Sequence, residues 1–388
     1  MIKLFPYLTS NFLMNFGRVI PQAILTPILL EKGLDFSQIV IVQIAFTITI
    51  LLFEFPSGIL ADIFSKAKVY IFSVFLLSIS YAVVLLSSGI QMMIVAWVLY
   101  GISAAGQSST MDLYFAEKLR NDESNLKRFY SIDQNTLLIS SIISSIVGSF
   151  LYGIVGINIY KLSIIAIILS VVNALIFFPK DSFKTKNYAK TTNPLKDILK
   201  GVYGSLENWQ IKIAVILIII TDIAITAFFN VWQMILINAD FSPSYFGIIF
   251  IALQLANIVS NIIFSKIKSG NYIYYCCLSG IVIVAAMLLL FDNILLLIPL
   301  FFLPLFLFIY VAFLHTRLQK LMPEHLMSSI GSATGTLSAL LSLATLGFIS
   351  LTLQSFSPST VLSFSLLIFC ATSFTFILSA RLRREVNI

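Results

Sequence analysis

Long runs of apolar residues, separated by short polar breaks, make up most of the chain. A helix that crosses the hydrocarbon core of a bilayer needs about 20 predominantly apolar residues. The runs between charged or Pro- and Gly-rich breaks predict twelve such helices, at approximately 4–30, 37–61, 69–89, 91–115, 129–155, 159–179, 209–237, 243–265, 271–291, 294–316, 327–353 and 358–380. The pattern therefore predicts an all-α membrane protein.

The longest polar break divides these helices into six and six. It covers about 180–208 and is rich in lysine, which is typical of a connecting loop. We therefore expect a six-helix bundle over residues 1–180, a cytoplasmic linker loop over 181–208 and a second six-helix bundle over 209–388.

The composition excludes a soluble fold. Of the 388 residues, 59% are hydrophobic and only 11% are charged, whereas charged residues make up about 25% of a soluble domain. The three cysteines, Cys276, Cys277 and Cys370, fall inside apolar runs, so they are interpreted as small packing residues without a disulfide framework.

The basic residues determine the expected orientation. With the N-terminus in the cytoplasm, all but three of the 24 Lys and Arg fall on the cytoplasmic side; the exceptions are Lys32 and Lys161 outside and Arg18 within a helix. Cytoplasmic loops of membrane proteins carry this excess of positive charge. The net charge of +7 is therefore interpreted as a topology signal, aided by anionic lipid headgroups, and not as a nucleic-acid site.

A short repeat relates the two halves. The segment Phe64–Lys68 (FSKAK) returns as Phe264–Lys268 (FSKIK), in both cases at the cytoplasmic end of the second helix of its half. Two pseudo-symmetric six-helix bundles are a transporter architecture, in which the substrate is held between the halves near the midplane of the membrane.

The loop after the second helix carries a recognisable motif. Residues Pro56–Lys68 resemble the loop 2–3 signature of the major facilitator superfamily, Gly-x-Leu-Ala-Asp-Arg-x-Gly-Arg-Lys, with Ile63 and Ser65 standing where Arg and Gly are usual. The preceding Glu54–Gly58 resembles the Glu-Ile-Pro-Thr-Gly form of a bacterial branch of exporters. The resemblance implies the superfamily's fold, a monomer and a bacterial inner membrane.

The same motif implies a conformational latch. Gly58 would let helices approach closely, and Asp62 could accept hydrogen bonds from the N-terminus of a facing helix. The resemblance implies that this latch favours the outward-open state; its members would be Gly58, Asp62, Lys66 and Lys68, with Asp112 as a gate or interhelical bond. The alternative is a simple positive-inside loop.

Two other patterns of proton-coupled drug exporters are missing. Residues Ala96–Gly101 lack the arginine expected before a glycine in helix 4, and helix 5 carries serines instead of its usual Gly-Pro motif. Those serines form two ridges at a spacing of four residues, Ser140/Ser144/Gly148 and Ser141/Ser145/Ser149, which favour close helix packing over substrate contact.

Ionisable residues inside a membrane helix are costly and are functional candidates by default. Arg18 and Asp222 lie near the middle of helices 1 and 7, which face each other in the superfamily, so an Arg–Asp pair would bridge the halves. Glu54 is a candidate proton carrier, or else the permanent salt-bridge partner of Arg18; Asp222 is the next candidate carrier.

Polar residues also recur on single faces of several helices. One interpretation is interhelical hydrogen bonding; as a set, they favour a water-accessible cavity. The expected cavity residues are Asn15, Arg18, Gln22, Gln43, Gln107, Thr226, Asn230, Gln233, Gln254 and Asn257.

These observations predict a secondary transporter that works by alternating access, exporting a small amphipathic or drug-like compound in exchange for protons. Uptake by symport and lipid flipping use the same fold and stay open. There is no Walker-type phosphate loop to use ATP and no clustered His or Cys to serve an enzyme, so we expect neither catalysis nor a cofactor or metal.

Overall fold

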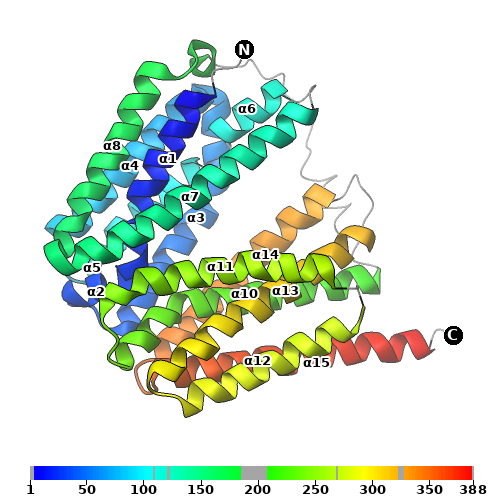
Figure 1. The fold of residues 1–388 in the computed structure, drawn as a ribbon. Helices are drawn as coiled ribbons and strands as arrows, with labels where there is room; N and C mark the ends of the chain where they lie inside the picture. Colours follow the sequence, from blue (N-terminus) through cyan, green and yellow to red (C-terminus); the bar gives the residue numbers. More distant parts are fainter. Residues whose placement is uncertain are drawn as a thin grey trace. The chain divides into compact units, whose positions relative to one another are not determined.

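The computed structural model describes residues 4–107, 110–119, 123–184, 208–267, 270–321 and 327–386. Within these ranges the chain is built from helices and short connecting turns (Figure 1). By its contacts it forms two compact units, one of Met1–Ala189 with Ser242–Ile251 and one of Lys190–Phe241 with Ala252–Ile388. Most of the expected linker, 185–207, lies outside the described residues.

The first unit holds the helices of the first half of the chain. Its helices are α1 (Phe5–Val19), α2 (Leu25–Glu31), α3 (Phe36–Phe64), α4 (Lys66–Leu86), α5 (Ile90–Gln107), α6 (Met111–Leu119), α7 (Glu123–Val155) and α8 (Ile159–Phe177), with 3-10 turns η1 (Gln22–Ile24), η2 (Gly156–Asn158) and η3 (Lys180–Phe183).

The second unit holds most of the remaining helices. They are α10 (Trp209–Asn238), α11 (Phe246–Lys266), which follows the turn η4 (Pro243–Tyr245) and begins within the first unit, α12 (Tyr272–Leu290), α13 (Leu297–Leu321), which follows the turn η5 (Ile294–Leu296), α14 (Met327–Thr352) and α15 (Pro358–Val386).

The helix lengths confirm the predicted all-α membrane fold. Eleven helical stretches of the described chain are long and apolar enough to cross a membrane. The longest of them, Arg128–Phe177, has 50 residues and holds most of α7 and all of α8. The count is therefore close to the predicted twelve.

The first predicted helix is interrupted, and its sequence explains the break. Pro21 follows the end of α1 and has no backbone N–H to continue the helical hydrogen bonds, so the chain passes through η1 before α2 begins. Gly148 of α7 lies against the backbone carbonyl of Ile20 at this point, where a larger residue would collide with the main chain. At this break the main chain therefore packs directly against α7.

Helix α8 buries small polar side chains at its helix contacts, while several of its large apolar side chains face outward. On α8, Ser163 and Ser170 are buried, whereas Leu169 and Leu175 are half or more exposed. Lipid tails solvate leucine as well as a protein core does, so close packing of small residues is what holds membrane helices together.

The contact between α1 and α8 shows this packing in detail. Ser10 Oγ donates to Ser170 O at 3.0 Å and Ser170 Oγ donates to Ser10 O at 2.8 Å, so each serine bonds the other's backbone. Figure 1 shows α1 (dark blue) beside α7 and α8, which are its main partners. On α7, Ser140 Oγ donates to Phe12 O of α1 at 3.0 Å, which agrees with the packing role predicted for that ridge.

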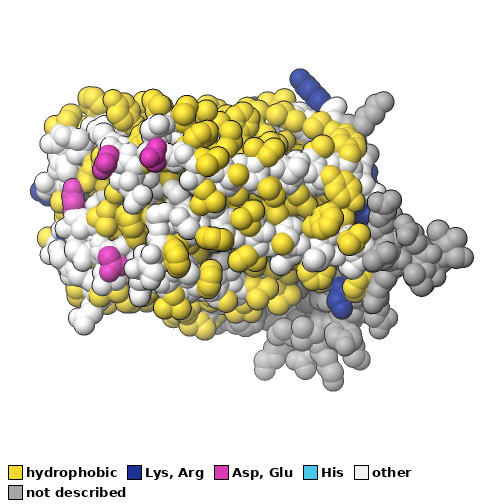
Figure 2. Space-filling model, turned by 90° about the horizontal axis from the view of Figure 1, so that it is seen from below, with side chains coloured by type: hydrophobic (Ala, Val, Ile, Leu, Met, Phe, Trp, Pro, Cys, Tyr) yellow, Lys and Arg dark blue, Asp and Glu magenta, His cyan; other side chains and the backbone are white. Residues whose placement is uncertain are grey.

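The outer surface has the character of a membrane-embedded protein. Figure 2 shows one face on which hydrophobic side chains cover the middle, while acidic side chains gather toward one end and most of the visible Lys and Arg toward the other. Charges placed away from the middle of the helices are spared the cost of facing hydrocarbon.

The close approach of α1 and α8 predicts the effect of a single methyl group. A Cβ at Gly17 would lie 2.7 Å from Ser163 O and 2.7 Å from Ile167 Cγ1, so Gly17→Ala should force the helices apart and destabilise the protein by about 1–3 kcal/mol. A Cβ at Gly347 of α14 would meet no heavy atom within 4 Å, so Gly347→Ala should be neutral or stabilising by up to about 1 kcal/mol. Thermal unfolding in detergent measures both; equal effects would contradict the packing argument.

Candidate functional site

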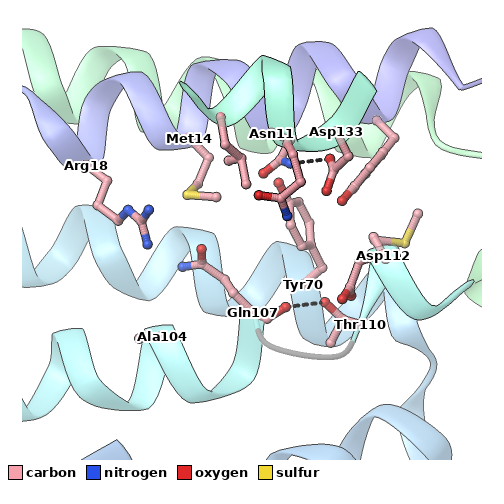
Figure 3. Close-up of a pocket in the computed structure, with 13 residues that line it drawn as sticks. Asn11, Met14, Arg18, Tyr70, Ala104, Gln107, Thr110, Asp112 and Asp133 are labelled. Atoms are coloured by element: carbon pink, nitrogen blue, oxygen red, sulfur yellow. Dashed lines mark hydrogen bonds between the residues drawn. The ribbon is translucent and has the colours of Figure 1, made fainter. Parts of the chain in front are cut away.

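A polar cavity of about 300 Å³ lies inside the first unit. Four residues of α1 line it, and α4, α5, α6, α7 and the turn before α6 supply the others (Figure 3). Its charged residues are Arg18, Asp112 and Asp133. Asp133 is buried, whereas Arg18 and Asp112 are half-buried.

One end of the cavity is built around Asp133 of α7, whose exposed fraction is only 6%. Asn11 Nδ2 of α1 donates to Asp133 Oδ1 at 2.8 Å, and Tyr7, one turn earlier on α1, also hydrogen-bonds this carboxylate. Asp112 is close enough for its charge to interact with that of Asp133. This end therefore gathers two carboxylates and neutral hydrogen-bond donors.

The other end is built around Arg18. Arg18 Nη2 donates to Asn15 Oδ1 at 2.6 Å. Asn15 is itself fully buried and donates to Leu137 O and Ser141 Oγ of α7, at 3.0 Å in each case. The amide of Asn15 is therefore fixed by α7, and it holds one edge of the guanidinium in place.

Three buried polar atoms of residues that line the cavity have no hydrogen-bond partner within the described structure. They are the donor Arg18 Nε, the acceptor Asp112 Oδ1 and Tyr70 OH, which can act as either. Buried polar groups are nearly always satisfied by protein, water or ligand. An orphaned donor and an orphaned acceptor at one cavity therefore indicate where a bound group would find partners.

The middle of the cavity is lined by α5 and the chain that follows it. Gln107 ends α5 and donates through Nε2 to Ser103 Oγ at 2.8 Å, while its backbone oxygen accepts from Thr110 Oγ1 at 2.8 Å. Figure 3 shows Gln107 between Arg18 and the carboxylates, with Met14 of α1 on the opposite wall.

The structure brings three sequence-predicted residues, Arg18, Gln107 and Asp112, to this cavity. Asn15 stands directly behind Arg18. Gln22 lies further along the chain and donates to Tyr100 OH at 3.4 Å. Gln43 of α3 is half-buried and does not line this cavity.

Sequence reasoning missed Asp133, Tyr7 and Tyr70. Asp133 falls close to the predicted start of its helix, where a carboxylate resembles an ordinary surface charge. A signal was present: the serine ridge Ser141/Ser145/Ser149, extended backward in steps of four, passes through Leu137 and Asp133. The tyrosines carry no comparable signal, because aromatic residues are common throughout these helices.

The predicted residues of the second unit form a chain of bonds along α10. Asp222 is half-buried and its Oδ2 accepts from Ser338 Oγ of α14 at 2.8 Å. Thr226 Oγ1 donates to Asp222 O at 2.9 Å, and Asn230 Nδ2 to Thr226 O at 2.8 Å. Thr226 and Asn230 thus use these donors within their own helix, whereas Asp222 joins two helices.

The remaining candidates of that unit lie on α10 and α11. Gln233 has an exposed fraction of 6%. Gln254 and Asn257 are half-buried, and Asn257 Oδ1 accepts from Asn261 Nδ2 at 3.2 Å. Their part in a cavity stays a prediction.

The salt bridge considered between Arg18 and Glu54 is wrong. Glu54 of α3 is exposed, and the ion pairs between described residues do not include it. Arg18 is instead held by the neutral amide of Asn15. Arg18 and Asp222 belong to different units, so a pair between them stays a prediction.

The region of the predicted latch is held by ion pairs that involve α6. Lys66 Nζ, at the start of α4, lies 2.5 Å from Glu117 Oε1 of α6. Lys118 of α6 pairs with Asp181 of η3. Lys68 is exposed, and Gly58 and Asp62 fall outside the residues whose side-chain environment the structure describes. Glu117 was missed because the motif that places Lys66 in the predicted latch does not indicate a partner on α6.

Ser65 has a backbone conformation that suits glycine. It caps α4 with φ 114° and ψ 147°, a backbone conformation that residues other than glycine rarely adopt. This is the position at which the superfamily motif has Gly, so the substitution of Ser for Gly leaves local strain of about 1–3 kcal/mol. Its Oγ accepts from Lys68 N at 3.4 Å, which offsets little of that strain.

Comparison with known proteins agrees with this architecture. A family model described as Major Facilitator Superfamily matches residues 7–346. A comparison with curated protein sequences found no match.

Solved structures of transporters have the same fold. A POT family transporter in complex with 5-aminolevulinic acid is 12% identical, with a TM-score of 0.76 over 97% of this chain and 95% of that one. The nucleoside transporter NupG is 12% identical, with a TM-score of 0.70 over 96% of each chain. A bacterial homologue of the human lysosomal transporter Spinster is 10% identical, with a TM-score of 0.72 over 96% of this chain and 95% of that one.

The strain at Ser65 predicts a stabilising substitution. Ser65→Gly should raise the free energy of unfolding by about 1 kcal/mol or more, because glycine adopts a positive φ without steric cost. Ser87 ends α4 with φ −121°, which any residue tolerates, so Ser87→Gly should be neutral or destabilising. Thermal unfolding of both variants checks this; a loss of stability at Ser65 would contradict it.

The ion pair of η3 predicts a local dependence on pH. Lys118 holds the pKa of the Asp181 carboxyl below its usual range. The carboxyl of an unfolded Asp has a pKa of about 3.9, so the pair stabilises the structure above about pH 4. This contribution to stability is lost as the pH falls through the lower pKa of the folded state.

Asp181→Asn should therefore speed amide hydrogen exchange in η3 at neutral pH. The partly exposed pair contributes less than about 1 kcal/mol, so the expected effect is less than about fivefold. The difference between the wild type and the variant should shrink as Asp181 is protonated. A difference that persists unchanged at the most acidic pH the protein tolerates would contradict the ion-pair explanation.

Proposed function

The chain belongs to the major facilitator superfamily, and on that premise we propose that it is a secondary active transporter working by alternating access. We propose that it exports a small amphipathic or drug-like compound in exchange for protons, across a bacterial cell membrane. In this proposal the chain acts as a monomer, with both termini in the cytoplasm.

The observation that carries the proposal is the charged cavity of the first unit. An ionised side chain within a membrane helix costs at least a few kcal/mol, so it is retained where it serves an ion or substrate pathway. Here Arg18, Asp112 and Asp133 line one cavity of about 300 Å³. That volume lies at the small end of the range of ligand sites.

We assign proton coupling to carboxylates that water reaches in one conformation of the transporter and not in the other. Asp222 suits this role because it is half-buried and its carboxylate is bonded by a neutral hydroxyl, Ser338 Oγ. Glu54, which is exposed and free of an ion pair with Arg18, is the second candidate.

The similar solved structures do not indicate which compound this chain transports. One of them is a nucleoside transporter and another is a complex with 5-aminolevulinic acid, so one fold serves chemically different compounds. Export instead rests on the resemblance of Glu54–Gly58 to the motif of an exporter branch.

The latch also remains part of the proposal. Gly58, Asp62, Lys66 and Lys68 would hold one conformation, with Asp112 as the gate. The pairing of Lys66 with Glu117 supports a role for this end in conformational change, because it joins α4 to the short helix that carries Asp112 to the cavity.

Everted membrane vesicles test the proposal. A panel of radiolabelled small amphipathic compounds, cationic, anionic and zwitterionic, would be offered to vesicles with an acidified lumen. At least one compound should accumulate only while the proton gradient is maintained. Accumulation in right-side-out vesicles with an inward proton gradient would instead indicate uptake by symport.

Removing a proton carrier should uncouple transport from the gradient. Asp222→Asn and Glu54→Gln should each lower gradient-driven accumulation at least tenfold, while exchange of labelled for unlabelled compound continues without a gradient. Asp292→Asn, at an exposed position between α12 and α13, is the matched control and should retain full accumulation. Full accumulation in both carrier variants would contradict the assignment.

A further inference from the structure

We propose that the cavity of the first unit binds a zwitterion, with its anionic group on Arg18 and its ammonium group on Asp112 and Asp133. This inference rests on the proposed transport function, because it takes the bound compound to be the cargo. All of the residues that line the cavity belong to the first unit, so the site needs no contribution from the second.

The Arg18 end requires an anionic group. The ion pairs between described residues do not include Arg18, and its Nη2 bonds the neutral amide of Asn15. Its Nε is buried without a partner. A guanidinium offers parallel donors that fit a carboxylate, and hydrogen bonds between charged groups are stronger than neutral ones. A carboxylate on the ligand would satisfy Nε and supply that charge.

The opposite end requires a cationic group. Asp133 is bonded by neutral donors, Asn11 and Tyr7, and no Lys or Arg pairs with it among the described residues. Asp112 adds a second negative charge nearby and an unpartnered Oδ1. A primary ammonium has three donors and a full positive charge, so it could bond both carboxylates at once.

The two ends are separated along α1, which explains why they do not neutralise each other. Asn11, which holds Asp133, precedes Arg18 by seven residues, or about 10 Å along the helix axis. A direct ion pair cannot bridge that separation, whereas a molecule with its charges at opposite ends can; an extended dipeptide, for example, spans about 7 Å.

The wall between the charged ends indicates the middle of the ligand. Met14 lies between Asn11 and Arg18 on α1 (Figure 3), and Leu137 lines the cavity from α7. An apolar spacer would bury these two side chains, while Gln107 on the facing wall already donates through Nε2 to Ser103 Oγ. The geometry therefore favours an ω-amino acid or a compound of similar charge spacing over an inorganic ion or a singly charged amphipath.

Binding to the purified full-length protein tests the charge requirement. The probes are two zwitterions, ε-aminocaproic acid and para-(aminomethyl)benzoic acid, with the methyl ester and the N-acetyl derivative of each. Esterification removes the negative charge and acetylation removes the positive one, while the spacer is unchanged. Each zwitterion should bind at least tenfold more tightly than either of its blocked derivatives, as measured by ligand-dependent shifts in the thermal unfolding midpoint and by equilibrium dialysis.

Substitutions at the two ends should change the preference in opposite ways. Arg18→Gln should remove the preference for the zwitterion over the ester, and Arg18→Lys should retain part of it. Asp112→Asn and Asp133→Asn should each weaken the preference for the zwitterion over the N-acetyl derivative. Lys161→Gln and Asp292→Asn, at exposed positions, are charge-matched controls and should bind like the wild type.

The unliganded unfolding midpoint of each variant shows whether it is folded. Asp133→Asn can lose stability, because the amide keeps only one oxygen to accept from Asn11 and Tyr7. Asp112→Asn then still tests the acidic end, since Asp112 Oδ1 has no partner to lose. Equal binding of the blocked derivatives, absence of binding by both zwitterions, or an unchanged preference in Arg18→Gln and Asp112→Asn would overturn the inference.

Failure of the site and failure of the transport proposal give different results. If zwitterions bind as expected but nothing accumulates in the vesicles, the site stands and the proposed function fails. If another member of the panel accumulates with the proton gradient and the zwitterions show no preference, the proposed function stands and this site assignment fails.

Discussion

The structure depends on one constraint: inside hydrocarbon there is no water to satisfy a polar group, so each must find its partner within the protein. Helix α1 shows the consequence most clearly. Its Ser10, Asn11 and Asn15 are almost fully buried, and each bonds α7 or α8. These bonds require the helices to approach closely, which the absence of a side chain at Gly17 allows. The polar residues of α1 thus determine which helices surround it.

The same constraint makes unsatisfied groups informative. The neutral polar residues of α1 named above are paired, whereas Arg18 Nε and Asp112 Oδ1 at the cavity are not. Unlike a buried serine, a charged group cannot be satisfied cheaply by a backbone oxygen, because its desolvation costs far more than one neutral hydrogen bond returns. Charges of opposite sign at the two ends of one cavity are therefore better explained by a bound ligand than by helix packing.

The short helix α6 connects this cavity to the end of the unit that bears the superfamily motif. It carries Asp112 toward the cavity, and its Glu117 and Lys118 are paired with Lys66 of α4 and Asp181 of η3. One short helix therefore carries both a cavity carboxylate and the partners of these two ion pairs. Ser65 adds strain at the turn immediately before Lys66, which makes the conformation of this turn less favourable than the motif's usual glycine would.

The sequence alone determined the membrane class and the approximate helix segments, because the thickness of the hydrocarbon core sets the length of each apolar run. The motif at Pro56–Lys68 indicated the superfamily. The sequence also indicated Arg18, Gln107 and Asp112, since a polar residue among twenty apolar ones is conspicuous. Only the tertiary structure decided partners: that Asn15 and not Glu54 holds Arg18, that Lys66 meets Glu117, and that Asp133 reaches Asn11 across 122 positions of the chain. Periodicity identifies the face of a helix that is polar, but the neighbour opposite that face depends on how the helices pack, which no local pattern encodes.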